Sequence, residues 1–119
     1  METPLSAITT HVLDTSCGRP AAGVQVVLEL QDGDARDRWE IVGRGETDAD
    51  GRLRTLMPPG DAPPGVYRLI FETRKYFDTL SVQALYPQVV VVFEVAAGRA
   101  HYHVPLLLSP FGYSTYRGS

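Results

Sequence analysis

The sequence has almost no cysteine for disulfide bonds and no apolar run long enough to hold it in a membrane. Cysteine occurs once, as Cys17, so an intrachain disulfide is excluded, and with it the class of small secreted scaffolds that depend on several bridges. The longest apolar runs, Val89–Phe93 and Val104–Leu108, fall far short of the about 18 residues that a membrane-spanning helix needs. Met1–Pro4 has neither the positive charge nor the apolar stretch of a signal peptide. We therefore expect a cytoplasmic protein that makes no membrane contact.

Positive charge and cofactor signatures are scarce as well. The chain has 11 Lys and Arg against 14 Asp and Glu, a formal net charge of −3, and a pI of about 5.5. Such a surface offers no field for a phosphate backbone, so we expect no nucleic-acid partner. The sequence also lacks a Gly-x-Ser-x-Gly elbow, a phosphate-binding glycine loop, a Rossmann fingerprint and a Cys-x-x-Cys pair. Nucleotide binding and cofactor-dependent redox chemistry therefore lose their support.

Turn-forming residues, by contrast, are abundant. Eleven glycines and nine prolines occur among 119 residues, above the average usage of about 12% for the two together. They separate short runs of β-branched and aromatic residues, which is the pattern of an all-β sandwich. A chain of this length forms one domain, residues 1–119. The predicted strands are Ser6–Leu13, Val24–Leu30, Arg38–Thr47, Arg52–Leu56, Val66–Thr73, Val89–Val95, His101–Leu108 and Tyr113–Arg117.

Four segments carry more specific structural predictions. Tyr76–Ala84 is the one stretch that reads as a helix. Met57–Gly65 holds four prolines and must be a surface loop, because proline cannot join a central ladder. Val89–Val95 begins with the apolar run Val89–Phe93, which predicts a central strand covered on both faces. Asp48–Gly51 ends in Asp-Gly, which predicts a hairpin turn.

The segment His101–Leu108 carries two histidines on one face. In a strand, alternate side chains point to opposite sides, so His101, His103, Pro105 and Leu107 share the face that points away from the core. The two histidines are then about 7 Å apart along the strand. A face of this composition is partly polar and partly apolar, as in a pocket or a subunit interface. The alternative is a pair of surface histidines near a turn.

The third histidine extends the possible chemistry. His11 lies on the first predicted strand, with Thr9 and Leu13 on its face. A histidine cluster can act as a general base or bind a metal, and His-x-His with a distant histidine resembles a three-histidine zinc site. No acidic residue lies on the histidine face of the later strand to orient an imidazole, so we favour a site without metal. Cys17 is interpreted as an incidental thiol.

Four motifs, in order along the chain, carry a resemblance to a known family. They are Thr10–Asp14, Thr47–Arg52, His101–Pro110 and Tyr113–Ser119, which ends in Tyr-Arg-Gly-Ser. Together they resemble the signatures of the 5-hydroxyisourate hydrolases, the transthyretin-related enzymes of purine degradation. The similarity runs from about Ser6 to the last residue.

This resemblance implies both a fold and an activity. The fold is a transthyretin-like β-sandwich of two four-stranded sheets with one short helix. The chain is expected to form a homotetramer, a dimer of dimers whose active sites lie in the channel between dimers. The activity is hydrolysis of 5-hydroxyisourate in urate degradation, without cofactor or metal. The family's active-site residues correspond to His11, Arg52, His103, Tyr116 and Ser119, and its less critical histidine corresponds to His101.

Each of these residues has an expected role in the reaction. His103 and His11 are the candidate base and its partner, and which of them takes the proton stays open. Arg52 offers a planar fork of donors for an oxyanion, and its charge would keep a nearby histidine neutral. Tyr116 and Ser119 would hydrogen-bond the substrate. The alternative function is a transthyretin-like carrier of small ligands, although transthyretin lacks this residue set.

Overall fold

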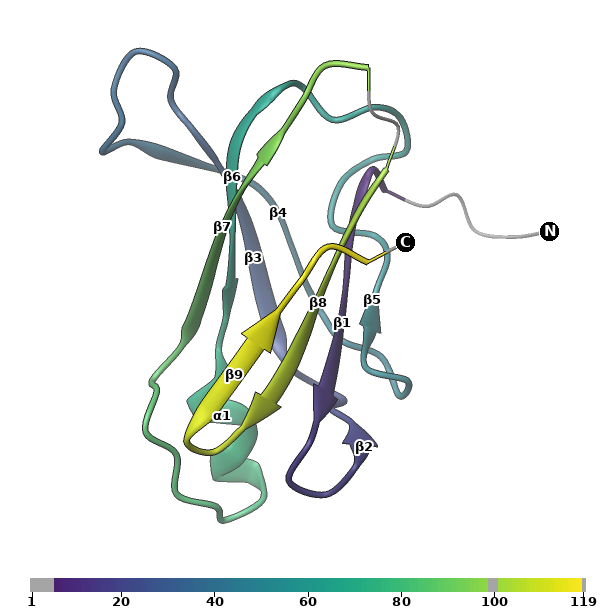
Figure 1. Ribbon diagram of the computed structural model, residues 1–119, viewed down its shortest axis with the longest axis vertical. Helices are drawn as coiled ribbons and strands as arrows, with labels where there is room; N and C mark the ends of the chain where they lie inside the picture. The colour runs from purple at the N-terminus through teal and green to yellow at the C-terminus, as the bar shows by residue number, and fades with distance from the viewer. Residues whose placement is uncertain (1–5, 99–100, 119) are drawn as a thin grey trace, which may run out of the picture.

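Two β-sheets packed face to face form the fold in the computed structural model, which describes residues 6–98 and 101–118 (Figure 1). A single short helix lies at one end of the sandwich, between two strands of the same sheet. The elements in chain order are β1 (Ile8–Asp14), β2 (Arg19–Pro20), β3 (Gln25–Gln31), β4 (Trp39–Glu46), β5 (Arg52–Leu53), β6 (Gly65–Phe71), α1 (Thr73–Thr79), β7 (Val89–Val95), β8 (Tyr102–Ser109) and β9 (Gly112–Thr115). The all-β, transthyretin-like prediction is confirmed in its layers and in its one helix.

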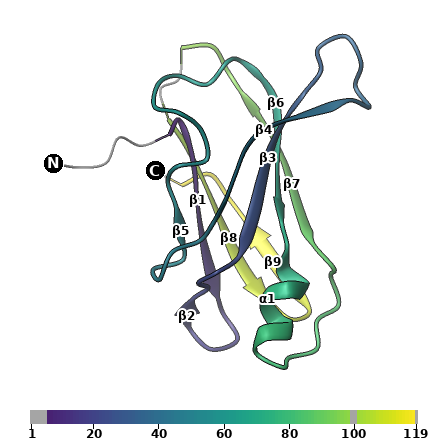
Figure 2. The same ribbon diagram turned by 180° about the vertical axis from the view of Figure 1, so that it is seen from behind.

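The two sheets differ in how they are completed. One has the order β4-β3-β6-β7, with every neighbouring pair antiparallel. The other has the order β2-β1-β8-β9, and β5 also pairs with β1. Because β8 occupies one edge of β1 in parallel pairing, β2 and β5 must share the opposite edge. Figure 2 shows β5 lying alongside β1. Two short strands therefore share this edge, and one of them, β2, lies outside all the predicted strands.

The core lies between the sheets and follows the period-2 alternation of the strands. Buried side chains alternate with more exposed ones along β6 and along most of β3 and β8, and on β8 they include the predicted inward face. Burial of this kind supplies most of the driving force for folding, about 1.5–3 kcal/mol for each large apolar side chain. The fully buried large side chains are Tyr67, Phe71, Phe77, Ile8, Leu28, Leu69, Leu106, Leu108, Val12, Val24, Val26 and Val89.

The helix is shorter and earlier than predicted. It spans Thr73–Thr79 rather than Tyr76–Ala84. Tyr76 and Phe77 are both buried, and this packing fixes the helix directly after β6. Ser81 has a positive φ of 55°, so the chain leaves the helical conformation before residues 82–84. Within the described ranges, no helix is long and apolar enough to cross a membrane.

The prediction for Val89–Val95 is right in its bounds and wrong in its position. β7 is an edge strand, not a central one, because it ends the sheet order next to β6. Its apolar run splits between the two faces: Val89 and Val91 point into the core, while Val90 and Val92 are 38% and 58% exposed. Apolar character on both sides therefore marks an outward surface here rather than a second buried face.

The Asp48–Gly51 segment is a tight reversal, as predicted, but it is not a hairpin. β4 and β5 lie in different sheets, so the turn carries the chain from one layer to the other. The Asp48 carboxylate oxygen Oδ1 accepts hydrogen bonds from the backbone N–H groups of Asp50 and Arg52, each at 2.9 Å. The strand that follows is β5 (Arg52–Leu53), shorter than the predicted Arg52–Leu56. The turn thereby delivers Arg52 to the edge of β1.

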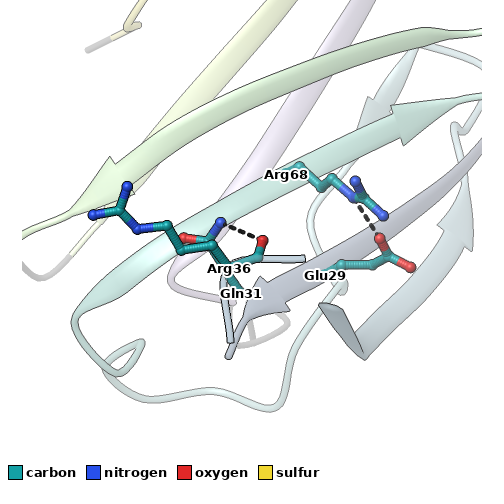
Figure 3. Close-up of polar contacts among 4 residues, drawn as sticks. All are labelled: Glu29, Gln31, Arg36 and Arg68. Atoms are coloured by element: carbon teal, nitrogen blue, oxygen red, sulfur yellow. Dashed lines mark hydrogen bonds and ion pairs between the residues drawn. The ribbon is translucent and has the colours of Figure 1, made fainter. Parts of the chain in front are cut away.

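The outer face of the other sheet combines polar contacts of β3 and β6 with the exposed valines of β7. Glu29 and Arg68 are cross-strand partners and form an ion pair with 2.6 Å between Oε1 and Nε (Figure 3). The Arg68 guanidinium also lies 4.1 Å from the centre of the Trp39 ring. Nearby, the Gln31 amide donates to the backbone carbonyl of Arg36 at 2.9 Å. The composition of this face differs sharply from that of the histidine-bearing face of β1 and β8.

Candidate active site

His11 and Arg52 are brought side by side by the pairing of β1 with β5. They are direct cross-strand partners, and opposite residues of an antiparallel pair point to the same face. The approach depends on Gly51, which has a φ of 76° and whose carbonyl accepts from the Val12 N–H at 2.8 Å. A Cβ at Gly51 would lie 2.4 Å from the Val12 carbonyl oxygen. Only glycine lets the turn close against β1 and present Arg52 next to His11.

The imidazole of His11 is oriented by the same turn. Its Nε2 lies 3.0 Å from the backbone carbonyl oxygen of Asp50. A carbonyl can only accept, so Nε2 carries the proton and donates, and Nδ1 holds the lone pair of the neutral ring. The turn therefore fixes both the cation and the imidazole tautomer on this part of the face.

His103 joins this face through the parallel pairing of β8 with β1. The register places His103 opposite Thr9, and Pro105 opposite His11, so the two histidines lie diagonally on adjacent strands. The chain beyond β9 continues alongside β8, where the Gly118 N–H donates to the His103 carbonyl at 2.8 Å. A Cβ at Gly118 would lie 2.6 Å from His103 Cδ2. Glycine thus allows the C-terminal backbone to lie directly on the edge of the imidazole.

The environment of His103 disfavours its protonated form. Burial is the larger cause that holds the pKa of His103 below its ordinary value, and the nearby positive charges of Arg52 and Arg54 act in the same direction, as do His101 and His11. A half-buried imidazole in this setting is neutral at neutral pH and available to take a proton. The sequence predicted the effect of Arg52, and the structure adds burial as the dominant cause.

Thr9 links His103 of β8 with His101, which lies directly before this strand. Its hydroxyl oxygen Oγ1 lies 2.8 Å from His103 Nδ1 and 3.1 Å from His101 Nε2. The two imidazole rings are nearly parallel, with centroids 6.5 Å apart. Thr9 is 3% exposed. From the sequence alone, Thr9 lies on the same face as His11 but has no evident role. Only the pairing of β1 with β8 shows that it lies opposite His103.

The remaining predicted residues lie elsewhere or outside the described chain. Tyr116 follows β9, is 55% exposed, and lines a groove of about 270 Å³ together with Tyr102 and Arg117. Among the described residues, Thr9 is hydrogen-bonded to His101 and His103, whereas no hydrogen bond joins the Tyr116 side chain to the histidines. Ser119 lies outside the described residues. Cys17 is exposed, in the turn between β1 and β2.

The positions of the three histidines also bear on metal binding. Within residues 6–98 and 101–118, no group of three or more His, Cys, Asp or Glu side chains is arranged to hold a metal ion. Nitrogens of His101 and His103 converge on a hydroxyl group instead. The face thus presents the imidazoles of His101 and His103, both held by Thr9, together with the Arg52 guanidinium. This set of groups is suited to proton transfer and to stabilisation of developing negative charge.

Known proteins are similar to this chain in sequence and in fold. Residues 8–118 match the HIUase/Transthyretin family. The chain belongs to this family. A 5-hydroxyisourate hydrolase of Salmonella typhimurium is 46% identical over 112 residues, covering 94% of this chain and 80% of that protein. The 5-hydroxyisourate hydrolase of Mus musculus is 41% identical over 119 residues, which is the full length of both chains.

Solved structures of the family have the same architecture. The 5-hydroxyisourate hydrolase of Klebsiella pneumoniae superposes with a TM-score of 0.81 at 36% identity, covering 97% of this chain and 100% of that one. Transthyretin from Sparus aurata superposes with a TM-score of 0.86 at 32% identity, covering 94% and 96%. The hydrolase relatives show that this family member is an enzyme, a hydrolase. Because transthyretin superposes as well, the fold by itself does not specify the chemistry.

Proposed function

We propose that this protein, acting as one domain over residues 1–119, hydrolyses 5-hydroxyisourate to 2-oxo-4-hydroxy-4-carboxy-5-ureidoimidazoline in urate degradation. The observation that carries the proposal is the half-buried His103, whose pKa is lowered by burial and by Arg52, on the same face as His11. Relatives that bear the name 5-hydroxyisourate hydrolase support the substrate.

His103 acts as the general base in this proposal. It takes a proton from water through Nε2 as the water oxygen bonds to a ring carbonyl carbon of the substrate. Collapse of the tetrahedral intermediate breaks the carbon–nitrogen bond of the six-membered ring, and the departing nitrogen receives the proton from His103. General-base catalysis of this kind contributes about 10²–10⁴-fold in rate. His103 is assigned this role because burial and Arg52 hold its ring neutral, whereas His11 donates from Nε2 to the Asp50 carbonyl and is assigned to substrate binding.

Arg52 stabilises the negative charge that develops on the carbonyl oxygen. Its guanidinium is always charged and carries five donors in a fixed fork. The cross-strand pairing with His11 holds the start of the side chain in place before substrate arrives, and preorganised donors of this type contribute about 10²–10³-fold in kcat. His11 binds the substrate beside Arg52, and Tyr116 and Ser119 supply further hydrogen bonds. The step needs neither a metal nor an organic cofactor.

The proposal is tested with 5-hydroxyisourate generated by uricase and followed by its ultraviolet absorbance. The wild-type protein accelerates the decay, while His103→Ala and His11→Ala abolish the acceleration and keep the wild-type circular dichroism spectrum. Cys17→Ser serves as the control, since Cys17 lies in an exposed turn and its replacement leaves the rate unchanged. A wild-type protein that leaves spontaneous decay unchanged would identify a carrier. Loss of activity on chelation, restored by zinc, would contradict the cofactor-free mechanism.

We further propose that the active form is a cytoplasmic homotetramer, a dimer of dimers with the histidine face lining a channel. The support is the pair of sheet edges formed by β7 and β9, which end their sheets and so leave backbone groups available for pairing with another copy. Val92 and Tyr113 are exposed on these strands. A small-molecule substrate is the other partner, and neither nucleic acid nor a membrane is expected. The single cysteine supports a reducing compartment.

A further inference from the structure

We propose that Thr9 is a positioning residue that sets the tautomer of His103, so that the ring keeps its proton on Nδ1 and presents the lone pair of Nε2 to the reacting water. This inference rests on the proposed function, because it assigns Thr9 a part in making His103 a base. Thr9 itself touches neither the substrate nor the water.

The contact geometry restricts Thr9 to a few arrangements. Its Oγ1 is within hydrogen-bond distance of His103 Nδ1, at 2.8 Å, and of His101 Nε2, at 3.1 Å. A hydroxyl has a single proton to donate and two lone pairs to accept with, so it can donate to only one of the two nitrogens at a time. Thr9 is 3% exposed, which leaves little room for solvent to replace either bond.

Two fully bonded arrangements of the neutral rings are possible. In the first, His103 Nδ1–H donates to Thr9, whose hydroxyl donates to His101 Nε2. In the second, His101 Nε2–H donates to Thr9, and the hydroxyl donates to His103 Nδ1. The second arrangement puts the His103 proton on Nε2 and engages the Nδ1 lone pair with the Thr9 hydroxyl, so neither nitrogen is free to accept a proton from water. Only the first leaves His103 with a basic nitrogen free, and Thr9 makes it possible by accepting from Nδ1.

His101 completes this arrangement without needing a fixed tautomer of its own. It is exposed, so water can satisfy its other nitrogen, and its Nε2 is available to accept from Thr9. This explains why the ring of an exposed histidine directly before β8 lies nearly parallel to that of His103. His101 holds the Thr9 hydroxyl in the orientation that accepts from His103.

The neighbouring residue supplies a matched control. Thr10 is also fully buried, but its side chain points to the opposite side of β1, where Oγ1 donates to the Val104 carbonyl at 2.6 Å. Thr9→Val and Thr10→Val therefore remove one buried hydroxyl each from adjacent positions of one strand. Each substitution removes buried hydrogen bonding by one hydroxyl, and only Thr9→Val deprives the histidines of a partner.

The experiment compares Thr9→Val, Thr9→Ser and Thr10→Val by steady-state kinetics with uricase-generated 5-hydroxyisourate. We expect Thr9→Val to lower kcat by about 10–100-fold, the usual effect of removing a partner that orients a histidine, with KM changed by less than about twofold. Thr9→Ser retains the hydroxyl and restores kcat to near the wild-type value, while Thr10→Val leaves kcat unchanged. Equal losses of kcat in Thr9→Val and Thr10→Val, or no rescue by serine, would overturn the proposal.

A second measurement does not depend on the substrate. Nitrogen-15 NMR distinguishes the two neutral imidazole tautomers, and an untagged chain has only three histidines, so the His103 signals are assigned by their loss in His103→Gln. We expect the Nδ1–H tautomer at His103 in the wild-type protein and a shift toward Nε2–H in Thr9→Val. A wild-type ring protonated at Nε2 overturns the proposal even if Thr9→Val fails to fold. An inactive wild-type protein with the Nδ1–H ring would instead contradict the proposed function and keep the role of Thr9.

Discussion

At the scale of single residues, one imidazole depends on the charge and the shape of its neighbours. Four cationic or titratable side chains lie near His103: Arg52 on β5, Arg54 directly after it, His11 on β1, and His101 directly before β8. Burial acts in the same direction as these charges, so the ring is held neutral by two independent causes. Each can be altered by a substitution that leaves the ring itself intact.

Removing the charge of Arg52 should raise the pKa of His103. Arg52→Gln takes away a cation that disfavours the imidazolium, so the pKa rises toward its ordinary value but stays below it, because burial remains. The acidic limb of kcat/KM therefore moves to higher pH, and kcat falls with the loss of the oxyanion donors. Arg52→Lys keeps the charge and is expected to keep the low pKa. The measurements are an NMR titration of His103 and a pH–rate profile; an unmoved titration midpoint in Arg52→Gln would contradict the prediction.

The second residue-scale prediction concerns the backbone of Gly118. An added methyl group would come within 2.6 Å of His103 Cδ2, so Gly118→Ala must turn the ring or push the C-terminal segment away. A displacement of about 1 Å at a reacting group costs up to about 10²-fold in rate. We expect kcat to fall on this scale while the free energy of unfolding changes by less than about 1 kcal/mol.

The control for this substitution is a glycine with open space around it. A Cβ at Gly33, in the turn between β3 and β4, would meet nothing within 4 Å, so Gly33→Ala should match the wild-type protein in both measurements. Equal activity of Gly118→Ala and Gly33→Ala would show that the C-terminal backbone does not position His103.

At the scale of elements, the helix is attached to the histidine-bearing sheet by one buried polar contact. The Tyr76 hydroxyl of α1 donates to Asp14 Oδ2, at the end of β1, at 2.8 Å. Burial alone would raise the pKa of Asp14, but hydrogen bonds from Ser16, Tyr76 and Cys17 outweigh it and lower the pKa below its ordinary value. The same contact and burial raise the pKa of Tyr76. The carboxylate thus ties α1 to the strand that carries His11.

Removal of the Tyr76 hydroxyl should destabilise the protein without reaching the site directly. Tyr76→Phe loses a hydrogen bond to a charged group, which contributes about 1.5–3 kcal/mol, and urea denaturation should show a decrease on that scale. Tyr86→Phe is the matched control, because the structure shows no hydrogen bond of the Tyr86 hydroxyl to any described residue and gives its ring an edge-on contact with Tyr113. An equal decrease in the two variants would rule out a specific contribution from the Tyr76–Asp14 bond.

Acid should weaken the fold through the carboxylates of Asp14 and Asp48. The pKa of Asp48 is also lowered, chiefly by the hydrogen bond from the Arg52 N–H. A carboxyl group whose pKa is lower in the folded state stabilises it fully above its unfolded pKa, about 3.9, and loses that contribution as the pH falls through the folded value. The free energy of unfolding should therefore fall below about pH 4. Asp14→Asn should flatten this dependence in denaturation curves measured at several pH values.

At the scale of the whole molecule, the site is an open face rather than an enclosed pocket. The imidazoles and Arg52 lie on the outward side of β1, β5 and β8, and the opposite sheet cannot cover them because it packs on the inward side. We therefore propose that a second copy of the chain supplies the other walls of the substrate site. The exposed apolar residues of β7 and β9 are consistent with such an assembly.

The assembly prediction is tested by mass. Light scattering after gel filtration should give about four times the chain mass of 13.1 kDa. Val92→Lys places a charge on the 58% exposed position of β7 and should yield smaller species with lower activity. Ile41→Lys, at a 49% exposed position of β4, should leave the mass unchanged. A monomeric wild-type protein with full activity would contradict the proposed channel.

Most of the strands and turns could be predicted from local sequence, which also nominated the candidate site residues, but β2 was missed. Alternation follows from local backbone geometry, and for this reason the inward faces of β3, β6 and β8 were predictable, as was the reversal at Asp48–Gly51. The helix was displaced in the prediction because burial of Tyr76 and Phe77, not local propensity, decides where it starts.

Which strands lie next to each other, and so which side chains share a face, depends on the tertiary structure. The parallel pairing of β1 with β8 joins Thr9 to His103 across 94 positions, and the crossing of the turn into β5 sets Arg52 beside His11. Neither pairing leaves a local signal, because a strand's sequence specifies its two faces but not its neighbours. The position of β7 at an edge and the lowered pKa of His103 have the same origin. Both depend on what lies next to a residue in space, which the packing of the whole chain determines.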